Sequence, residues 1–467
     1  MKNSRRKFIT QSSLYSLGFL GFRNFTHALG QAETGGLMPR AFGYGALQPD
    51  PHRIFDLPKG FRYRIIAQQG KRMDDGLLRP GDPDGMAAFP LEDGRVGLIC
   101  NHELSFGETG KGAFGKNNEN FSAPFQRTSY DAGRGMGPQL GGTTTLVYDP
   151  VRERTDLEYM SLLGTDRNCA GGPTPWNSWI TCEETNIRAD ALTAKDHGYN
   201  FEVPMSTEVR PVEPIPLKAM GRFRHEAVAV DPKTGIVYQT EDMSDGLIYR
   251  FIPKVPGKLA EGGRLQALAI LGAPSRDTRN WPELEQAAFA TERPVEVTWV
   301  DIEDVESPDD SLRFQGFDKG AARFARGEGM WAGDGEFYFA CTNGGPLRQG
   351  QIFRYVPSPK EGTAAEAGEP GRLELFVEST NPDLLRNCDN LTVAPNGHLV
   401  VCEDADEPCR LVGVSPKGEF YLIGENRYTS SELAGACFSP DGKVLFVNLQ
   451  KEGLTLAISG PWADVRA

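Results

Sequence analysis

The sequence predicts an all-β fold and, within it, a six-bladed β-propeller. Three observations support this. The 467 residues include 54 Gly and 33 Pro, a share above the average for proteins and typical of a chain with many tight turns. Six segments repeat one hairpin pattern. Further strand-like runs follow most of these segments, so that each repeat has about four strands.

The repeated segment begins with a polar residue, which is followed by an apolar run and by a turn that usually contains Asp-Gly or Asn-Gly. A second apolar run then ends in Cys or Thr, often with an acid after it. The six segments are 84–103, 169–184, 226–242, 328–343, 390–404 and 432–450. Alternating apolar residues on both sides of such turns predict a β-hairpin in each segment.

Additional strands are expected at residues 142–149, 247–253, 351–357 and 410–416. Radial repetition of small sheets leaves only short, protected edges, which favours a propeller. The alternative arrangement is a sandwich of two sheets.

The polar residues that open the repeats are expected to share one place in the fold, because the innermost strand of each blade lines the central channel. These residues are Asp84, Cys169, Glu226, Glu328, Asn390 and Glu432. A second set of acids ends the hairpins: Glu103, Glu183, Glu241 and Glu403. So many carboxylates on one axis would repel each other unless cations neutralised them, so the pattern predicts a metal site in the channel. The alternative is that these acids face solvent at the channel mouth or cap turns.

The cysteines do not suggest a disulfide framework. Four of the eight, Cys100, Cys182, Cys341 and Cys402, end strand-like runs and are expected to be buried free thiols. No C-x-x-C or H-E-x-x-H motif occurs, which disfavours a zinc finger and a zinc hydrolase.

Charge and hydropathy exclude other classes. The net charge is −13 and no Lys/Arg cluster occurs beyond the N-terminus, so no nucleic-acid-binding surface is expected. The sequence contains no run of 18 or more apolar residues, so no membrane span is expected. Because the net charge is strongly negative, an anionic substrate would need a metal ion at its binding site.

The first 30 residues are expected to form an export signal. The order Ser4-Arg-Arg-Lys-Phe-Ile9 precedes a weakly apolar stretch and resembles the twin-arginine signal, which exports folded proteins. A disordered basic tail is the alternative. We expect residues 31–467 to form a single propeller domain that the twin-arginine machinery delivers to the periplasm or the exterior.

Several of these segments closely resemble the PhoX-type alkaline phosphatases. The most specific is the string from Asn168 to Thr185, NCAGGPTPWNSWITCEET, and the others span residues 221–243, 326–346, 389–405 and 431–451. The resemblance implies a phosphomonoesterase with two ferric ions, calcium ions nearby, and a small phosphoester as substrate.

The resemblance also implies residue roles. Cys169 corresponds to a thiolate that bridges the iron ions, Glu226 and Glu328 to iron or bridging ligands, and Arg326 to the phosphate-binding arginine. Glu183, Glu241 and Glu403 correspond to calcium ligands, and Asn390, Glu432 and Glu103 join the candidate ligand set. Two other functions remain open from the residues alone: a calcium-dependent propeller lactonase or esterase, and a propeller that only binds a partner.

Overall fold

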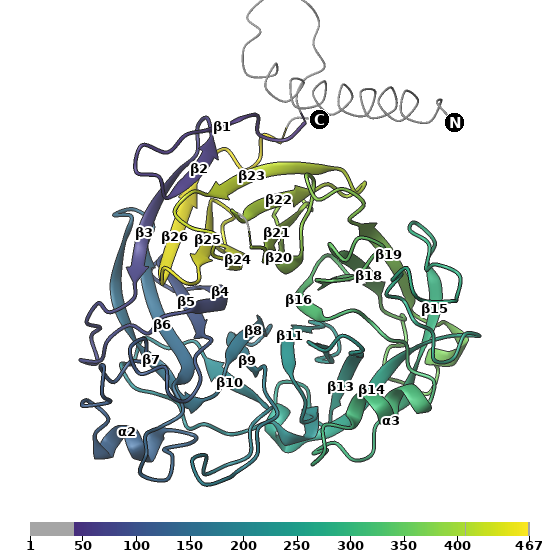
Figure 1. The fold of residues 1–467 in the computed structure, drawn as a ribbon, viewed down its shortest axis with the longest axis horizontal. Coiled ribbons are helices and arrows are strands. Elements are labelled where there is room, and N and C mark those ends of the chain that lie inside the picture. The colour runs from purple at the N-terminus through teal and green to yellow at the C-terminus, as the bar shows by residue number, and fades with distance from the viewer. Residues whose placement is uncertain (1–41, 407, 466–467) are drawn as a thin grey trace, which may run out of the picture.

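The computed structural model describes residues 42–406 and 408–465. It is built from β-strands arranged around a centre (Figure 1), with two short helices, α2 (Ala123–Thr128) and α3 (Leu312–Asp318), and three single-turn helices, η1 (Lys218–Met220), η2 (Leu259–Glu261) and η3 (Glu366–Gly368). Both the all-β class and the propeller-like arrangement expected from the sequence are therefore present. The proposed signal, residues 1–30, lies outside the described residues.

All six hairpins form where the repeats predict them. The inner strands are β4 (Pro83–Pro90), β8 (Asn168–Pro173), β11 (His225–Val230), β16 (Gly327–Ala332), β20 (Cys388–Val393) and β24 (Leu433–Phe438). Their antiparallel partners are β5 (Val96–His102), β9 (Ser178–Glu183), β12 (Val237–Glu241), β17 (Phe337–Cys341), β21 (Leu399–Glu403) and β25 (Val444–Leu449). Figure 1 shows the six inner strands following one another around the centre.

The outer strands complete the units less regularly than the sequence predicts. They are β6 (Gly141–Asp149), β7 (Arg154–Thr165), β10 (Asn200–Pro204), β13 (Ile248–Pro253), β14 (Gly263–Ile270), β15 (Val295–Asp301), β18 (Gln351–Val356), β19 (Arg372–Glu378), β22 (Arg410–Val414), β23 (Phe420–Asn426) and β26 (Leu454–Ser459). The unit that starts at β8 has only three strands. The units that start at β11 and β16 merge into one nine-stranded sheet because β15 pairs with β19. The described residues therefore form five hydrogen-bonded sheets, not six separate ones.

The ring is closed by strands from opposite ends of the described chain. β3 (Arg62–Gln68) pairs with β26 and completes the sheet of β24 and β25. Two further strands from before the first repeat, β1 (Leu47–Gln48) and β2 (Phe55–Pro58), extend the neighbouring sheet at β23. This pairing covers sheet edges that would otherwise be open.

Each inner strand carries a two-residue bulge. The register to the second strand shifts so that residues 84–85, 169–170, 226–227, 328–329, 389–390 and 435–436 have no partner in the ladder. A bulge re-aims side chains and occurs often beside functional sites. In five of the six strands, the first bulge residue is an acid or a cysteine.

Small residues let the inner strands approach closely around the axis. A Cβ added to Gly85 would lie 2.6 Å from the Cα of Ala170, and one added to Gly329 would lie 2.7 Å from the Cα of Asn390. These glycines, Ala170 and Ala227 line a cavity of about 10 Å³ together with Trp179 and Trp331. A space of this size holds at most a single water molecule, so the channel is filled below the bulges.

No helix in residues 42–406 and 408–465 is long and apolar enough to cross a membrane. The eight cysteines form no disulfide and are buried, which for Cys100, Cys182, Cys341 and Cys402 is what the sequence predicts.

Candidate metal centre

Carboxylates from five of the six inner strands or their flanks, and from the ends of two second strands, converge at one end of the channel. Three groups of carboxyl oxygens each lie within 4.8 Å of one another: Asp84, Glu103 and Glu432; Asp389, Asp404 and Glu432; and Glu226, Glu328 and Asp389. Glu432 belongs to the first two groups and Asp389 to the last two. The groups therefore form one continuous row of possible ligands.

Burial and mutual repulsion disfavour the ionised forms of these acids. The pKa of Asp84, Glu226, Glu328 and Glu432 is raised well above the ordinary value, chiefly by burial and then by neighbouring carboxylates. Burial, with repulsion from Asp404, raises the pKa of Asp389 to about 7. Bound cations would remove this penalty, and carboxylate oxygens are the ligands that hard cations such as Ca²⁺ prefer.

Cys169 lies beside this row. Its side chain is 4% exposed, and its thiol donates to the backbone carbonyls of His225 at 3.3 Å and of Glu226 at 3.6 Å. Burial and then the charge of Glu226 raise the pKa of the thiol well above its usual range. A thiolate at this position needs a neighbouring cation, which makes the thiol a plausible ligand and a poor free nucleophile.

Arginines and carboxylates alternate along the other side of the channel end. Arg167 Nη2 donates to Glu103 and to Glu184, both at 2.7 Å. Glu184 hydrogen-bonds Asp242, and burial followed by the charge of Asp242 raises the Glu184 pKa to about 8. This series starts at Glu103, in the first carboxylate group.

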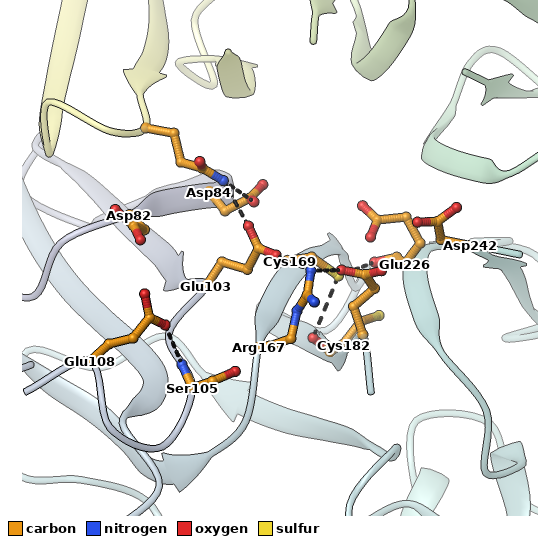
Figure 2. A network of polar contacts seen from close by, with 12 residues as sticks. Asp82, Asp84, Glu103, Ser105, Glu108, Arg167, Cys169, Cys182, Glu226 and Asp242 are labelled. Atoms are coloured by element: carbon orange, nitrogen blue, oxygen red, sulfur yellow. Dashed lines mark hydrogen bonds and ion pairs between the residues drawn. The ribbon is translucent and has the colours of Figure 1, made fainter. Parts of the chain in front are cut away.

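The series ends in the third carboxylate group through Arg326. Its Nε and Nη2 donate to the two Asp242 oxygens at 2.7 and 2.8 Å, and Nη2 also donates to Glu328 at 2.9 Å. Glu328 belongs to the group with Glu226 and Asp389. The row of acids and this arginine–carboxylate series therefore enclose the channel end as one charged ring, part of which is visible in Figure 2.

The structure gives Glu183, Glu241 and Glu403 other partners. Glu183 accepts from the backbone of Asp166, Gly198 and Tyr199 and from His197, Glu241 accepts from the backbone of Leu247 and from Tyr249, and Glu403 pairs with Arg410. None of the three belongs to a carboxylate group among the described residues.

The expectation that Glu183, Glu241 and Glu403 face the ring is therefore corrected: the residues that face it lie one position later in the sequence. Successive residues of a strand alternate between its two faces, so the residue that follows each of them takes that place: Glu184, Asp242 and Asp404. These three residues were not predicted as ligands, although each is the last residue of a repeat: 169–184, 226–242 or 390–404.

The fifth repeat is also displaced by one residue. Its first bulge residue is Asp389, which precedes the expected Asn390. Asn390 follows it, donates to the Asp389 carboxylate at 3.1 Å, and accepts the N–H of Gly435 at 2.8 Å. From the sequence, either Asp389 or Asn390 could open the repeat, and only the strand register shows that the first bulge residue is Asp389.

The other expected residues are brought together. Asp84, Glu103, Glu226, Glu328 and Glu432 belong to the carboxylate groups, Cys169 contacts Glu226, and Arg326 contacts Glu328. Arg167 was not expected, and its place directly before an inner strand, like that of Arg326, is the signal that could have found it.

A solved structure with a similar fold supports the architecture. The structure is similar to Pseudomonas fluorescens PhoX in complex with vanadate, with a TM-score of 0.63 at 17% identity, and the match covers 91% of this chain and 97% of that one. A Xanthomonas campestris gluconolactonase aligns with a TM-score of only 0.37 at 12% identity, over 92% of this chain and 100% of that one. No curated protein sequence matches the chain.

The fold and the site define a propeller-like protein whose acidic channel end could hold metal ions. The sequence matches the family model described as alkaline phosphatase PhoX over residues 42–148 and 136–453, which is most of its length. The chain therefore belongs to the PhoX alkaline phosphatase family, whose enzymes are phosphoric monoester hydrolases.

Proposed function

We propose that this chain is an exported, metal-dependent phosphatase that hydrolyses phosphomonoesters. The observation that carries the proposal is the continuous row of three carboxylate groups that share Asp389 and Glu432. Adjacent groups with common members suit adjacent cations with shared ligands. Because the chain belongs to a phosphatase family, we assign this row of carboxylates to metal-dependent hydrolysis of phosphoesters.

The donor set fits the metals that the family resemblance implies. The third group, with Glu226 and Glu328, has the Cys169 thiol beside it and suits ferric iron, which accepts carboxylates and a thiolate. The other two groups offer only carboxylate oxygens and suit calcium. We propose two ferric ions near Cys169 and calcium ions toward Asp84 and Asp404.

The metals, when bound, would offset the charge of a phosphate ester and supply a nucleophilic oxygen at neutral pH. The chain's own residues bind and orient the substrate. Arg326 uses Nε and Nη2 on carboxylates, so Nη1 has no acceptor among the described residues and is available to a phosphate oxygen. The Asp242 contact fixes the plane of this guanidinium before substrate arrives.

Metal analysis together with a phosphatase assay tests the proposal. Purified protein should contain iron and calcium, absorb visible light through iron–thiolate bonding, and hydrolyse p-nitrophenyl phosphate. Treatment with a chelator should abolish both the colour and the hydrolysis, and restoring the metals should recover them. Full hydrolysis by protein free of metal would refute metal dependence, and a colourless calcium protein that cleaves lactones would favour the lactonase alternative.

Export is proposed from the paired arginines near the N-terminus. Replacing both Arg5 and Arg6 by Lys should leave folded precursor in the cytoplasm. Normal periplasmic yield from that double variant would contradict the twin-arginine route.

A further inference from the structure

Arg167 and Arg326 occupy equivalent places in two repeats. Each directly precedes an inner strand, β8 or β16, and each has a left-handed backbone, with φ of 49° and 52°. The carbonyl of Arg167 accepts the N–H of Glu184 at 2.9 Å, and that of Arg326 accepts the N–H of Thr342 at 3.0 Å. Both side chains therefore start from the same end of the channel with the same backbone conformation.

The left-handed conformation is uncommon for a residue with a side chain and costs free energy relative to an extended or helical one. Asp82 and Asn387 have it at the same place, with φ of 42° and 41°. The repeat thus imposes this turn, and in two units the turn carries an arginine over the acidic ring.

Arg167 leaves more of its donors free than Arg326 does. Both of its hydrogen bonds use Nη2, so Nε and Nη1 have no acceptor among the described residues. Its side chain is 42% exposed, against 37% for Arg326. A guanidinium held by one nitrogen, with the others accessible, can bind an oxyanion without releasing its carboxylates.

The two arginines stand at different ends of the arginine–carboxylate series. Two carboxyl groups, Glu184 and Asp242, separate them, and these hydrogen-bond each other. Arg326 contacts Glu328 of the third carboxylate group, whereas Arg167 contacts Glu103 of the first. Figure 2 shows Arg167 between Glu103 and Asp242.

We infer that Arg167 binds a second anionic group on the substrate, so that the preferred substrates are phosphomonoesters whose alcohol part carries another phosphate or a carboxylate. The inference rests on the proposed phosphatase function. The phosphate that is cleaved lies at Arg326, and the second oxyanion is held by Nε and Nη1 of Arg167. Without Arg167, the carboxylates of Glu103 and Glu184 would repel an anionic alcohol part, which makes the arginine decisive for such substrates.

The test measures kcat/KM of the variants Arg167→Gln and Arg167→Lys for two substrates. A sugar bisphosphate has the second anion, and p-nitrophenyl phosphate lacks it. For Arg167→Gln we expect kcat/KM to fall about 10-fold more on the bisphosphate than on the aryl phosphate, mainly through KM. Arg167→Lys, which keeps the charge but has fewer donors, should lie between Arg167→Gln and the wild type on the bisphosphate.

Calorimetry gives a second readout without turnover. Arg167→Gln should weaken binding of methylenediphosphonate about 10-fold more than binding of orthophosphate. The matched control is Arg210→Gln, because Arg210 is 76% exposed and also pairs with a carboxylate, that of Glu208. The control should change neither ligand.

The outcomes separate this inference from the proposed function. Wild-type protein that hydrolyses neither substrate would contradict the phosphatase function. Wild-type protein that cleaves the aryl phosphate, with variants that lose both substrates equally or neither, would overturn only the role of Arg167. Loss of bound metal in both Arg167 variants would also overturn it, because Arg167 would then act through Glu103 and Glu184.

Discussion

The thiol of Cys169 is buried beside Glu226, at the residue where β8 departs from its ladder. We predict that Cys169→Ser loses iron, visible colour and phosphatase activity together. A serine hydroxyl has a high pKa and is a weak ligand, so it cannot replace a bridging thiolate. Metal analysis and an absorption spectrum check the prediction.

The control for this variant is Cys341→Ser. Cys341 is fully buried at the end of β17 and belongs to no carboxylate group. A buried hydroxyl there should cost roughly 1–3 kcal/mol of stability and leave the metal content of the folded protein unchanged. Equal iron in Cys169→Ser and wild type would show that the thiol is no ligand.

Neighbouring acids at the end of β21 should behave in opposite ways. Asp404→Asn removes a charge from the second carboxylate group, so we expect lower metal content and little change in the stability of the metal-free protein. Glu403→Gln instead weakens the largely buried ion pair with Arg410, which should cost about 3–5 kcal/mol. Melting temperatures and metal analysis of both variants decide the matter, and a reversed result would mean that the strand register differs from the one described.

Most of the ring residues could be predicted from the repeat, and the exceptions have one physical cause. The pattern placed Asp84, Glu103, Glu226 and Glu328 correctly because in these repeats a single acid stands at the relevant position. Where two candidates adjoin, as in Glu183-Glu184 or Asp389-Asn390, the choice depends on which face of a strand points inward. Register and bulges fix that face through tertiary pairing, which no local pattern records.

The bulges of the inner strands are the elements that aim the ligands, and they depend on small second residues. Gly329 follows Glu328 in its bulge, and an added Cβ would lie 2.7 Å from the Cα of Asn390. We predict that Gly329→Ala destabilises the fold by roughly 1–3 kcal/mol because backbone must move. It should also reduce metal content, since Glu328 and Asp389 belong to one group.

Gly368→Ala is the matched control. A Cβ at Gly368 would meet no atom within 4 Å. The substitution should leave melting temperature and metal content near those of the wild type. A Gly329→Ala variant as stable and as metal-rich as this control would contradict the role given to the bulge.

The hairpins were predictable, but their assembly into sheets was not. Turn residues and alternating apolar residues are local signals, and all six hairpins follow them. The β15–β19 pairing and the addition of β3 to β26 join segments far apart in sequence, and such contacts leave no periodic trace. The expectation of about four strands per unit fails at β8, whose unit has three strands, and where β15 joins two units into one sheet.

At the scale of the whole molecule, the acidic ring makes stability depend on pH when metals are removed. The folded-state pKa of Glu184 is about 8 and that of Asp389 about 7, both above the ordinary values for these acids. The metal-free folded state therefore holds more protons than the unfolded chain between roughly pH 4 and pH 8. Its stability should fall as the pH rises through that window.

Thermal melting at pH 5 and pH 8 checks this expectation. Chelator-treated protein should melt several degrees lower at pH 8 than at pH 5, whereas the metal-loaded protein should lose this difference because cations bind the ionised carboxylates. A metal-free protein that is more stable at pH 8 would show that the ring acids are not raised in pKa.

The pairing of β3 with β26 has a consequence for the order of events during synthesis. The sheet of β24 and β25 obtains its outermost strand from residues 62–68, which leave the ribosome long before residues 454–459. The first carboxylate group likewise needs Asp84 from the early chain and Glu432 from the late chain. A nascent chain can thus form its first hairpins while it is still being translated, but the full row of metal ligands can be assembled only after the last strands have emerged.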